Sequence, residues 1–81
     1  MQVTVLLFAG VAERAGTRRI DLAFEPGDTV ATVRDRVITL HPDLAPMVPT
    51  LMYALDEEYA REQDAVRPGA TLALIPPVSG G

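Results

Sequence analysis

The residues best suited to chemistry are the last six of the chain, Pro76-Pro77-Val78-Ser79-Gly80-Gly81. We expect Gly81 to end the protein, so that its α-carboxylate is the reactive group. Such a group titrates near about 3.5 and is ionised at pH 7. Pro76 and Pro77 fix φ and lack an amide N–H, so a central strand cannot continue through them. Six extended residues span about 20 Å, which is enough to carry a carboxylate into a buried site of another protein. The alternative is a frayed terminus, which most domains have.

The residue types in this tail, residues 76–81, fit insertion into a channel. The two prolines reduce the entropy lost when the tail is ordered. Val78 offers a small apolar contact, Ser79 a hydrogen-bonding hydroxyl, and the two glycines let another backbone approach closely. Lysine amines and cysteine thiols would attack an activated carboxylate. The chain has neither, because all seven basic residues are arginine and cysteine is absent. We therefore expect no self-capture.

Other residues that suggest chemistry have simpler interpretations. His41 is the single histidine and stands at an expected helix end, where an imidazolium interacts favourably with free carbonyls. Without cysteine it does not make a zinc site. Acidic residues form one run, namely Asp56, Glu57, Glu58, Glu62 and Asp64. The run lacks the spacing and the central glycine of an EF-hand loop. We interpret it as a solvated turn that steers a basic partner, and we expect no metal.

Three stretches predict the strands around the tail. Residues 3–9 are rich in β-branched and aromatic side chains and predict a first strand, with Val3, Val5 and Leu7 on one face. Residues 18–24 alternate as a second strand that forms a hairpin with the first, and residues 10–16 between them have room for one helical turn. Residues 71–75 predict the last strand, with Leu72 and Leu74 inward, and this strand leads directly into the tail.

One long helix is predicted over residues 29–40. Thr29 is suited to cap it, and Pro42 excludes the preceding residue from helical geometry. An apolar stripe toward the sheet is expected to hold Val30, Val33, Val37 and Leu40. The residues expected on or beside the wet side are Arg34, Asp35 and Arg36.

The remaining chain completes a mixed sheet. A proline-bearing connection over residues 42–49 precedes a third strand over residues 50–55, and a turn at residues 56–58 leads into a short piece around Tyr59. Four to five strands with one main helix are typical of the β-grasp arrangement, an α+β fold. We expect one domain over residues 1–75, followed by the tail over residues 76–81.

A possible binding surface lies beside the root of the tail. Leu6 and Phe8 face away from the expected core on the first strand, as does Ile75 on the last strand. If these strands are neighbours, the three side chains form an exposed apolar patch, which usually marks an interface. The alternative is ordinary partial burial of single apolar residues.

Composition excludes several classes of function. A net charge of −4 argues against a nucleic acid partner. No stretch approaches the roughly 20 apolar residues of a membrane span, and the first residues lack the basic start of a secretory signal. We therefore expect a cytoplasmic protein with no membrane partner.

Several stretches together resemble one family. They are Leu6-Leu7-Phe8-Ala9, Glu13-Arg14-Ala15-Gly16-Thr17, Thr29-Val30, the turn at Tyr59, and Ala73-Leu74-Ile75 followed by the tail. The chain resembles the MoaD family, the ubiquitin-like small subunits that carry sulfur in molybdopterin synthase. The resemblance spans the chain, and the Pro-Pro-Val-Ser-Gly-Gly ending is its most specific part. Two positions depart from the family pattern. Ala12 stands where an arginine is usual, and Leu55-Asp56-Glu57-Glu58 replaces Val-Asn-Gly-Glu, which predicts a turn of another shape.

The resemblance implies a covalent sulfur carrier that is not itself a catalyst. An E1-like enzyme of the MoeB type would use ATP to adenylate Gly81, and the carrier itself would bind no cofactor. A sulfur donor, such as a cysteine desulfurase or a rhodanese, would then convert the adenylate to a thiocarboxylate. The tail would enter the large, MoaE-type subunit and deliver sulfur to cyclic pyranopterin monophosphate. Two small subunits on a large-subunit dimer complete the implied heterotetramer.

Two alternatives share the fold and the Gly-Gly ending. One is a sulfur carrier that serves thiamine synthesis, tRNA thiolation or cysteine synthesis. The other is a ubiquitin-like modifier that is joined to target lysines. A small structural or toxin-like domain is a further class, and it predicts no dependence on Gly81.

Overall fold

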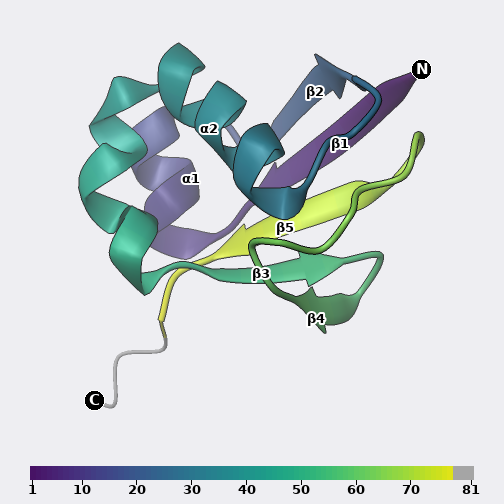
Figure 1. The fold of residues 1–81 in the computed structure, drawn as a ribbon. Helices are drawn as coiled ribbons and strands as arrows, with labels where there is room; N and C mark the ends of the chain where they lie inside the picture. The colour runs from purple at the N-terminus through teal and green to yellow at the C-terminus, as the bar shows by residue number, and fades with distance from the viewer. Residues whose placement is uncertain (78–81) are drawn as a thin grey trace.

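Five strands form one mixed sheet in the order β2-β1-β5-β3-β4 (Figure 1). The strands are β1 (Gln2–Leu7), β2 (Arg19–Ala23), β3 (Met52–Leu55), β4 (Glu58–Ala60) and β5 (Thr71–Ile75). The neighbours β1 and β5 are parallel, and the other neighbours are antiparallel. The computed structural model describes residues 1–77. This sheet and its helices confirm the predicted α+β, β-grasp fold.

Within residues 1–77, three helices cover one face of the sheet, and the other face carries no helix (Figure 1). They are α1 (Ala9–Ala15), α2 (Val30–Leu40) and a 3-10 helix, η1 (Pro42–Thr50). The core lies between the helices and the sheet, and it includes the predicted inward residues Val3, Val5, Leu7, Leu72 and Leu74. Within residues 1–77, none of the helices has the length and apolar character that a membrane crossing requires.

The start of α2 follows from its sequence. Thr29 Oγ1 accepts a hydrogen bond from the Thr32 amide at 3.3 Å, and Thr32 Oγ1 accepts one from the Thr29 amide at 2.8 Å. This reciprocal pair satisfies two amides that have no partner inside the helix. Val30, Val33 and Val37 are fully buried, as the apolar stripe predicts.

The prediction that Leu40 faces the sheet is wrong, because Leu40 is 57% exposed. It is the last residue of α2, and the chain turns at His41, whose amide donates to the Val37 carbonyl. The next fully buried apolar side chain is Leu44 of η1. The core beyond the end of α2 is thus filled from η1 and not from Leu40.

Two connections hold more helix than the sequence predicts. Ala9 begins the two-turn helix α1 and does not end the first strand, so a helix joins the antiparallel strands β1 and β2. Gly16 ends α1 with a φ of 76°, which is favourable for glycine. The connection after Pro42 is the 3-10 helix η1, which continues to Thr50, so the third strand begins later than predicted, at Met52.

Candidate functional site

The described part of the tail, Pro76 and Pro77, follows β5, the central strand of the sheet. β5 pairs with β1 on one side and with β3 on the other, and its Leu72 and Leu74 are fully buried. The strand stops at Ile75, and Pro76 and Pro77 lie outside it, which agrees with their missing amide N–H. The predicted site residues Val78, Ser79, Gly80 and Gly81 lie outside the described residues. A firmly anchored strand therefore leads into the tail.

The three predicted interface residues meet on the face of the sheet that carries no helices. Leu6 lies opposite Ala73 in the parallel pairing of β1 with β5, and the Phe8 amide donates to the Leu74 carbonyl at 3.4 Å. A hollow of about 380 Å³, here called the outer groove, is lined by Leu6, Phe8, Ala54, Glu57, Tyr59, Thr71, Ala73 and Ile75. Phe8 is 46% exposed. The structure brings the three residues together, and their role in binding stays a prediction.

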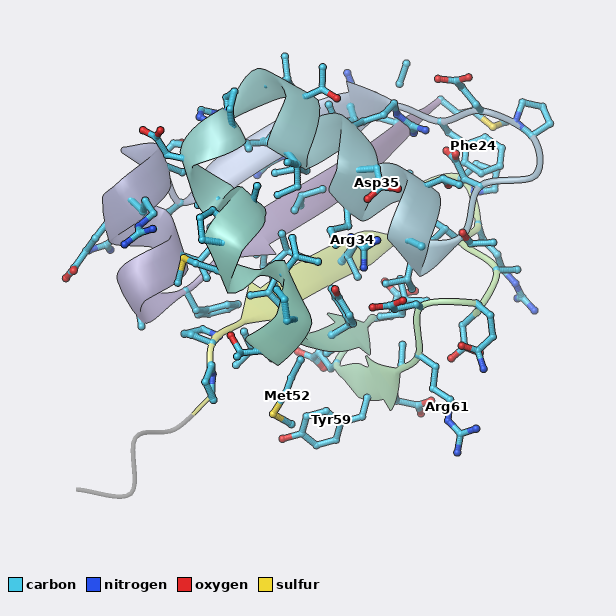
Figure 2. All side chains as sticks on the ribbon, turned by 60° about the vertical axis from the view of Figure 1, so that its left-hand side comes forward. Phe24, Arg34, Asp35, Met52, Tyr59 and Arg61 are labelled. Atoms are coloured by element: carbon cyan, nitrogen blue, oxygen red, sulfur yellow. The ribbon has the colours of Figure 1, made fainter. Side chains whose placement is uncertain are left out.

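Two further side chains extend this surface and were not predicted from the sequence to belong to it. Tyr59 is 79% exposed and lies opposite Ala54, while Met52 is 43% exposed and lies opposite Ile75. Figure 2 shows both side chains pointing away from α2. The alternation within β3 indicates that Met52 and Ala54 share a face. Tyr59 joins that face only through the pairing of β4 with β3, which the sequence does not specify.

The turn between β3 and β4 lies at one end of the outer groove. Asp56 and Glu57 both adopt positive φ, 47° and 74°, and Leu55 pairs with Glu58 across this two-residue loop. Positive φ at both central residues is the hairpin geometry that an Asn-Gly pair favours. The prediction of another turn shape is therefore wrong. Contacts to β5 hold the geometry, because the Asp56 amide donates to the Thr71 carbonyl at 2.9 Å.

The prediction that Arg34 lies on or beside the wet side of α2 is wrong, because Arg34 is 9% exposed and lies between α2 and the sheet (Figure 2). Its Nη1 donates to the Tyr53 hydroxyl and to the Glu62 carboxylate, both at 2.9 Å, and its Nη2 donates to Asp35. Burial alone would lower the pKa of Arg34. The hydrogen bonds with Tyr53 and Asp35 outweigh burial, and the pKa is raised. Arg34 thus stays charged and joins α2 to the strand beside β5.

Another ion pair, between Asp28 and Arg36, holds the loop that precedes α2. The buried Asp28 carboxylate accepts two hydrogen bonds from Arg36, at 2.7 and 2.8 Å, and others from the Glu25 amide and the Thr32 hydroxyl. The bonds with Arg36 lower the pKa of Asp28 well below its ordinary range. Burial acts in the opposite direction but is weaker. This pair stabilises the scaffold and lies apart from the outer groove.

Comparison with known proteins identifies the family. The model of the ThiS family matches residues 5–81. The chain belongs to the ThiS family. Among its relatives, the molybdopterin synthase sulfur carrier subunit of Chlamydomonas reinhardtii is 41% identical over 85 aligned residues, covering 100% of both chains. The human protein of the same name is 34% identical, covering 99% of this chain and 94% of its own. The resemblance seen in the sequence is confirmed.

Solved structures of similar proteins agree with the ThiS family fold. SAMP1 from Haloferax volcanii matches with a TM-score of 0.90 and 30% identity, covering 100% of both chains. One chain of the complex of subunits 1 and 2 of molybdopterin-converting factor from Helicobacter pylori matches with a TM-score of 0.69, again covering 100% of both chains. Its identity is 17%, so this likeness shows the fold alone.

Ala12, where the resemblance expects arginine, lines a second hollow beside α1 in this ThiS family member, and this hollow shares Leu6 and Phe8 with the outer groove. That hollow of about 510 Å³ is bounded by α1, by β1 and by the residues that immediately precede β2. Its lining includes Leu6, Phe8 and Arg18. The nearby Arg14 does not line it. Arg14 Nη1 donates instead to the Asp43 carbonyl at 3.4 Å, across the contact between α1 and η1. Arg14 therefore does not replace an arginine at position 12.

Proposed function

We propose that this chain is the sulfur-carrying small subunit of a molybdopterin synthase. The observation that carries this proposal is the match along the whole chain to a relative of that name, at 41% identity. The outer groove at the root of the tail supports it, because a carrier needs a surface that docks while its end reacts. The folded domain, residues 1–75, provides the docking surface, and residues 76–81 provide the reactive arm.

The proposed chemistry takes place at the Gly81 carboxylate and takes Gly81 as the terminal residue of the mature protein. One carboxylate oxygen attacks the α-phosphorus of ATP on an E1-like, MoeB-type enzyme, which expels pyrophosphate and forms an acyl-adenylate. The terminal sulfur of a persulfide on the sulfur donor then attacks the acyl carbon and displaces AMP, which forms an acyl disulfide. A thiol reductant cleaves the S–S bond of this disulfide, releases the donor as a thiol and leaves the thiocarboxylate. Transfer of this sulfur to cyclic pyranopterin monophosphate returns the carboxylate. ATP belongs to the activating enzyme, and the carrier binds no cofactor of its own.

The proposed partners follow from the same assignment. A large, MoaE-type subunit receives the tail and supplies the acids and bases of the transfer, and two carriers bind one large-subunit dimer. The sulfur donor is a cysteine desulfurase or a rhodanese, and the cycle takes place in the cytoplasm. The H. pylori complex of subunits 1 and 2 of molybdopterin-converting factor contains a chain of this fold, and we propose an assembly of the same kind for this chain.

Intact-mass spectrometry tests the carrier function. The chain is incubated with ATP, the activating enzyme and the sulfur donor, and we expect a mass gain equal to exchange of one oxygen for sulfur, confined to the C-terminal peptide. The untreated chain serves to verify that Gly81 is its last residue. A reaction without ATP is the control and gives no gain. An unchanged mass in the complete reaction contradicts the proposal.

A second function, protein modification, is favoured by one comparison. A solved structure of H. volcanii small archaeal modifier protein 1 matches with a TM-score of 0.85 and 28% identity, covering 95% of this chain. A modifier is joined through its C-terminal carboxylate to lysine amines of other proteins. Extracts would then contain isopeptide-linked species that are lost when Gly81 is deleted. Sulfur loading without such species favours the carrier function alone.

A further inference from the structure

We infer that Glu57 is an ionic anchor at the end of the outer groove and pairs with an arginine or lysine of the large synthase subunit. This inference rests on the proposed function and adds the chemistry of the partner surface. The matching surface presents an apolar side chain that enters the outer groove and a cation beside it that meets the Glu57 carboxylate.

The placement of Glu57 comes from the turn that carries it. Asp56 is held to β5 at both its amide and its side chain. Its amide donates to the Thr71 carbonyl at 2.9 Å, and its Oδ1 accepts from the Thr71 amide at 3.0 Å. The next residue, Glu57, lines the outer groove together with Leu6 and Thr71. It also lines a neighbouring hollow of about 350 Å³ together with Leu6, Asp56 and Thr71. The turn therefore places Glu57, which is exposed, at the edge of the apolar face.

The charges around the outer groove indicate that the partner surface is positively charged. Among residues 1–77, Glu57 is the one charged residue that lines the outer groove. The ion pairs within residues 1–77 engage other acids with arginines, namely Asp21, Glu25, Asp28, Asp35 and Glu62. The net charge of −4 on the whole chain also favours a positively charged partner. An apolar groove with an acidic end is complementary to an apolar protrusion flanked by a cation.

The backbone of Glu57 allows binding to be separated from folding. Its φ of 74° is uncommon for a non-glycine residue, and glycine is the favoured residue at this position of such a hairpin turn. Replacement by glycine removes the carboxylate. It also removes the conformational strain that positive φ imposes on a residue with a side chain. Stability and partner affinity should then change in opposite directions, which a purely structural role of Glu57 does not predict.

Neighbouring Glu58 offers a matched control of the same charge. Glu58 lies opposite Leu55, while Tyr59 lies opposite Ala54, so Glu58 and Tyr59 are on opposite faces of β4. Tyr59 lines the outer groove, and Glu58 is not among its lining residues. Neutralising Glu58 changes the net charge by the same amount without touching the proposed anchor.

The experiment measures binding of the purified large synthase subunit to full-length carrier variants at low and physiological salt. We expect Glu57→Gln and Glu57→Gly to lower kon by about 3- to 10-fold at low salt and to weaken its salt dependence. Glu58→Gln should change kon less than twofold. Glu57→Gly should in addition raise the Tm, while Glu57→Gln leaves it nearly unchanged.

Three outcomes overturn the anchor. They are unchanged binding of both Glu57 variants, equal effects of Glu57→Gln and Glu58→Gln, and a defect confined to loading by the activating enzyme. Sulfur loading of the unmodified carrier is measured in parallel and tests the proposed function separately. Normal loading combined with any of these three outcomes rejects the anchor and leaves the sulfur carrier in place.

Discussion

Arg34 Nη1 donates a hydrogen bond to the Tyr53 hydroxyl at 2.9 Å, which joins α2 to β3 inside the domain. Its guanidinium carbon lies 5.9 Å from the centre of the Tyr53 ring. Tyr53 lies opposite Leu74 in the pairing of β3 with β5. The contact therefore supports the strand that carries the tail, from the face opposite to the outer groove.

Tyr53→Phe should lower the free energy of unfolding by about 1.5 to 3 kcal/mol, the usual contribution of a buried hydrogen bond to a charged group. The phenyl ring keeps the packing, so the decrease in the free energy of unfolding measures the contribution of the hydroxyl's hydrogen bond. Tyr59→Phe removes an exposed hydroxyl and should be nearly neutral. Denaturant unfolding of the three proteins measures the effect, and equal stabilities of the two variants would contradict it.

Asp28→Asn should destabilise the domain by about 2 to 4 kcal/mol at pH 7, because it breaks a largely buried ion pair with Arg36. Asp21→Asn is the control, because Asp21 pairs with Arg19 on the surface, where such pairs contribute little. Thermal unfolding at pH 7 distinguishes the two variants. A loss for Asp28→Asn no larger than that for Asp21→Asn would show that the buried pair adds no stability.

The lowered pKa of Asp28 also predicts a pH dependence of stability. In the unfolded chain an aspartate titrates near about 3.9. In the folded chain its pKa is lower, so the unfolded state binds the proton first. The stability from Asp28 is therefore present above about pH 4 and is lost as the pH falls toward the folded pKa. Unfolding measured from pH 6 to pH 2 should show a smaller decline for Asp28→Asn than for the unmodified protein.

Phe8→Ala and Ile75→Ala should each weaken binding of the large subunit by about 1 to 3 kcal/mol, since both remove apolar anchors of the outer groove. Domain stability should change little, because the partly exposed side chains lie outside the buried core. Leu40→Ala is the matched control, because Leu40 is also exposed but lies at the end of α2. Calorimetric titration checks the affinities. Unchanged binding of both groove variants would exclude the groove as the docking surface.

Deletion of Gly81 should abolish sulfur loading and leave the domain folded. The buried residues of β5 end at Leu74, ahead of the two prolines. Val78→Ala keeps the terminal carboxylate and should still be loaded. Mass spectrometry and a thermal melt of each variant provide the two measurements. Loss of folding on deletion, or loading without Gly81, would contradict the prediction.

Much of the fold was predictable because local patterns agree with it. Val3, Val5 and Leu7 alternate as a strand with one buried face, and Thr29 caps a helix whose valines recur at helical spacing. The bounds of β5 were predicted without error, because Pro76 cannot continue the ladder. The placement of Leu6, Phe8 and Ile75 on one face also followed from alternation.

Other features depended on partners that are distant in the sequence. Arg34 is buried because Tyr53 and Glu62, 19 and 28 residues away, satisfy its guanidinium. A helical pattern cannot reveal this, since an arginine normally indicates the solvent-facing side. Leu40 is exposed because η1 supplies Leu44 to the core, and that depends on the path of the chain after the helix.

The sequence by itself determined the class of fold and the strand that ends at the prolines, because residue type and spacing are local properties, and it is the basis of the prediction that Gly81 carries the chemistry. Tertiary structure decided which residues surround that strand. It placed Tyr59, Met52 and Glu57 beside Leu6 and Ile75 through strand pairing, and it held the Asp56-Glu57 turn in left-handed geometry through Thr71. The physical reason is that cross-strand neighbours are set by register and topology, and neither is encoded in any single segment.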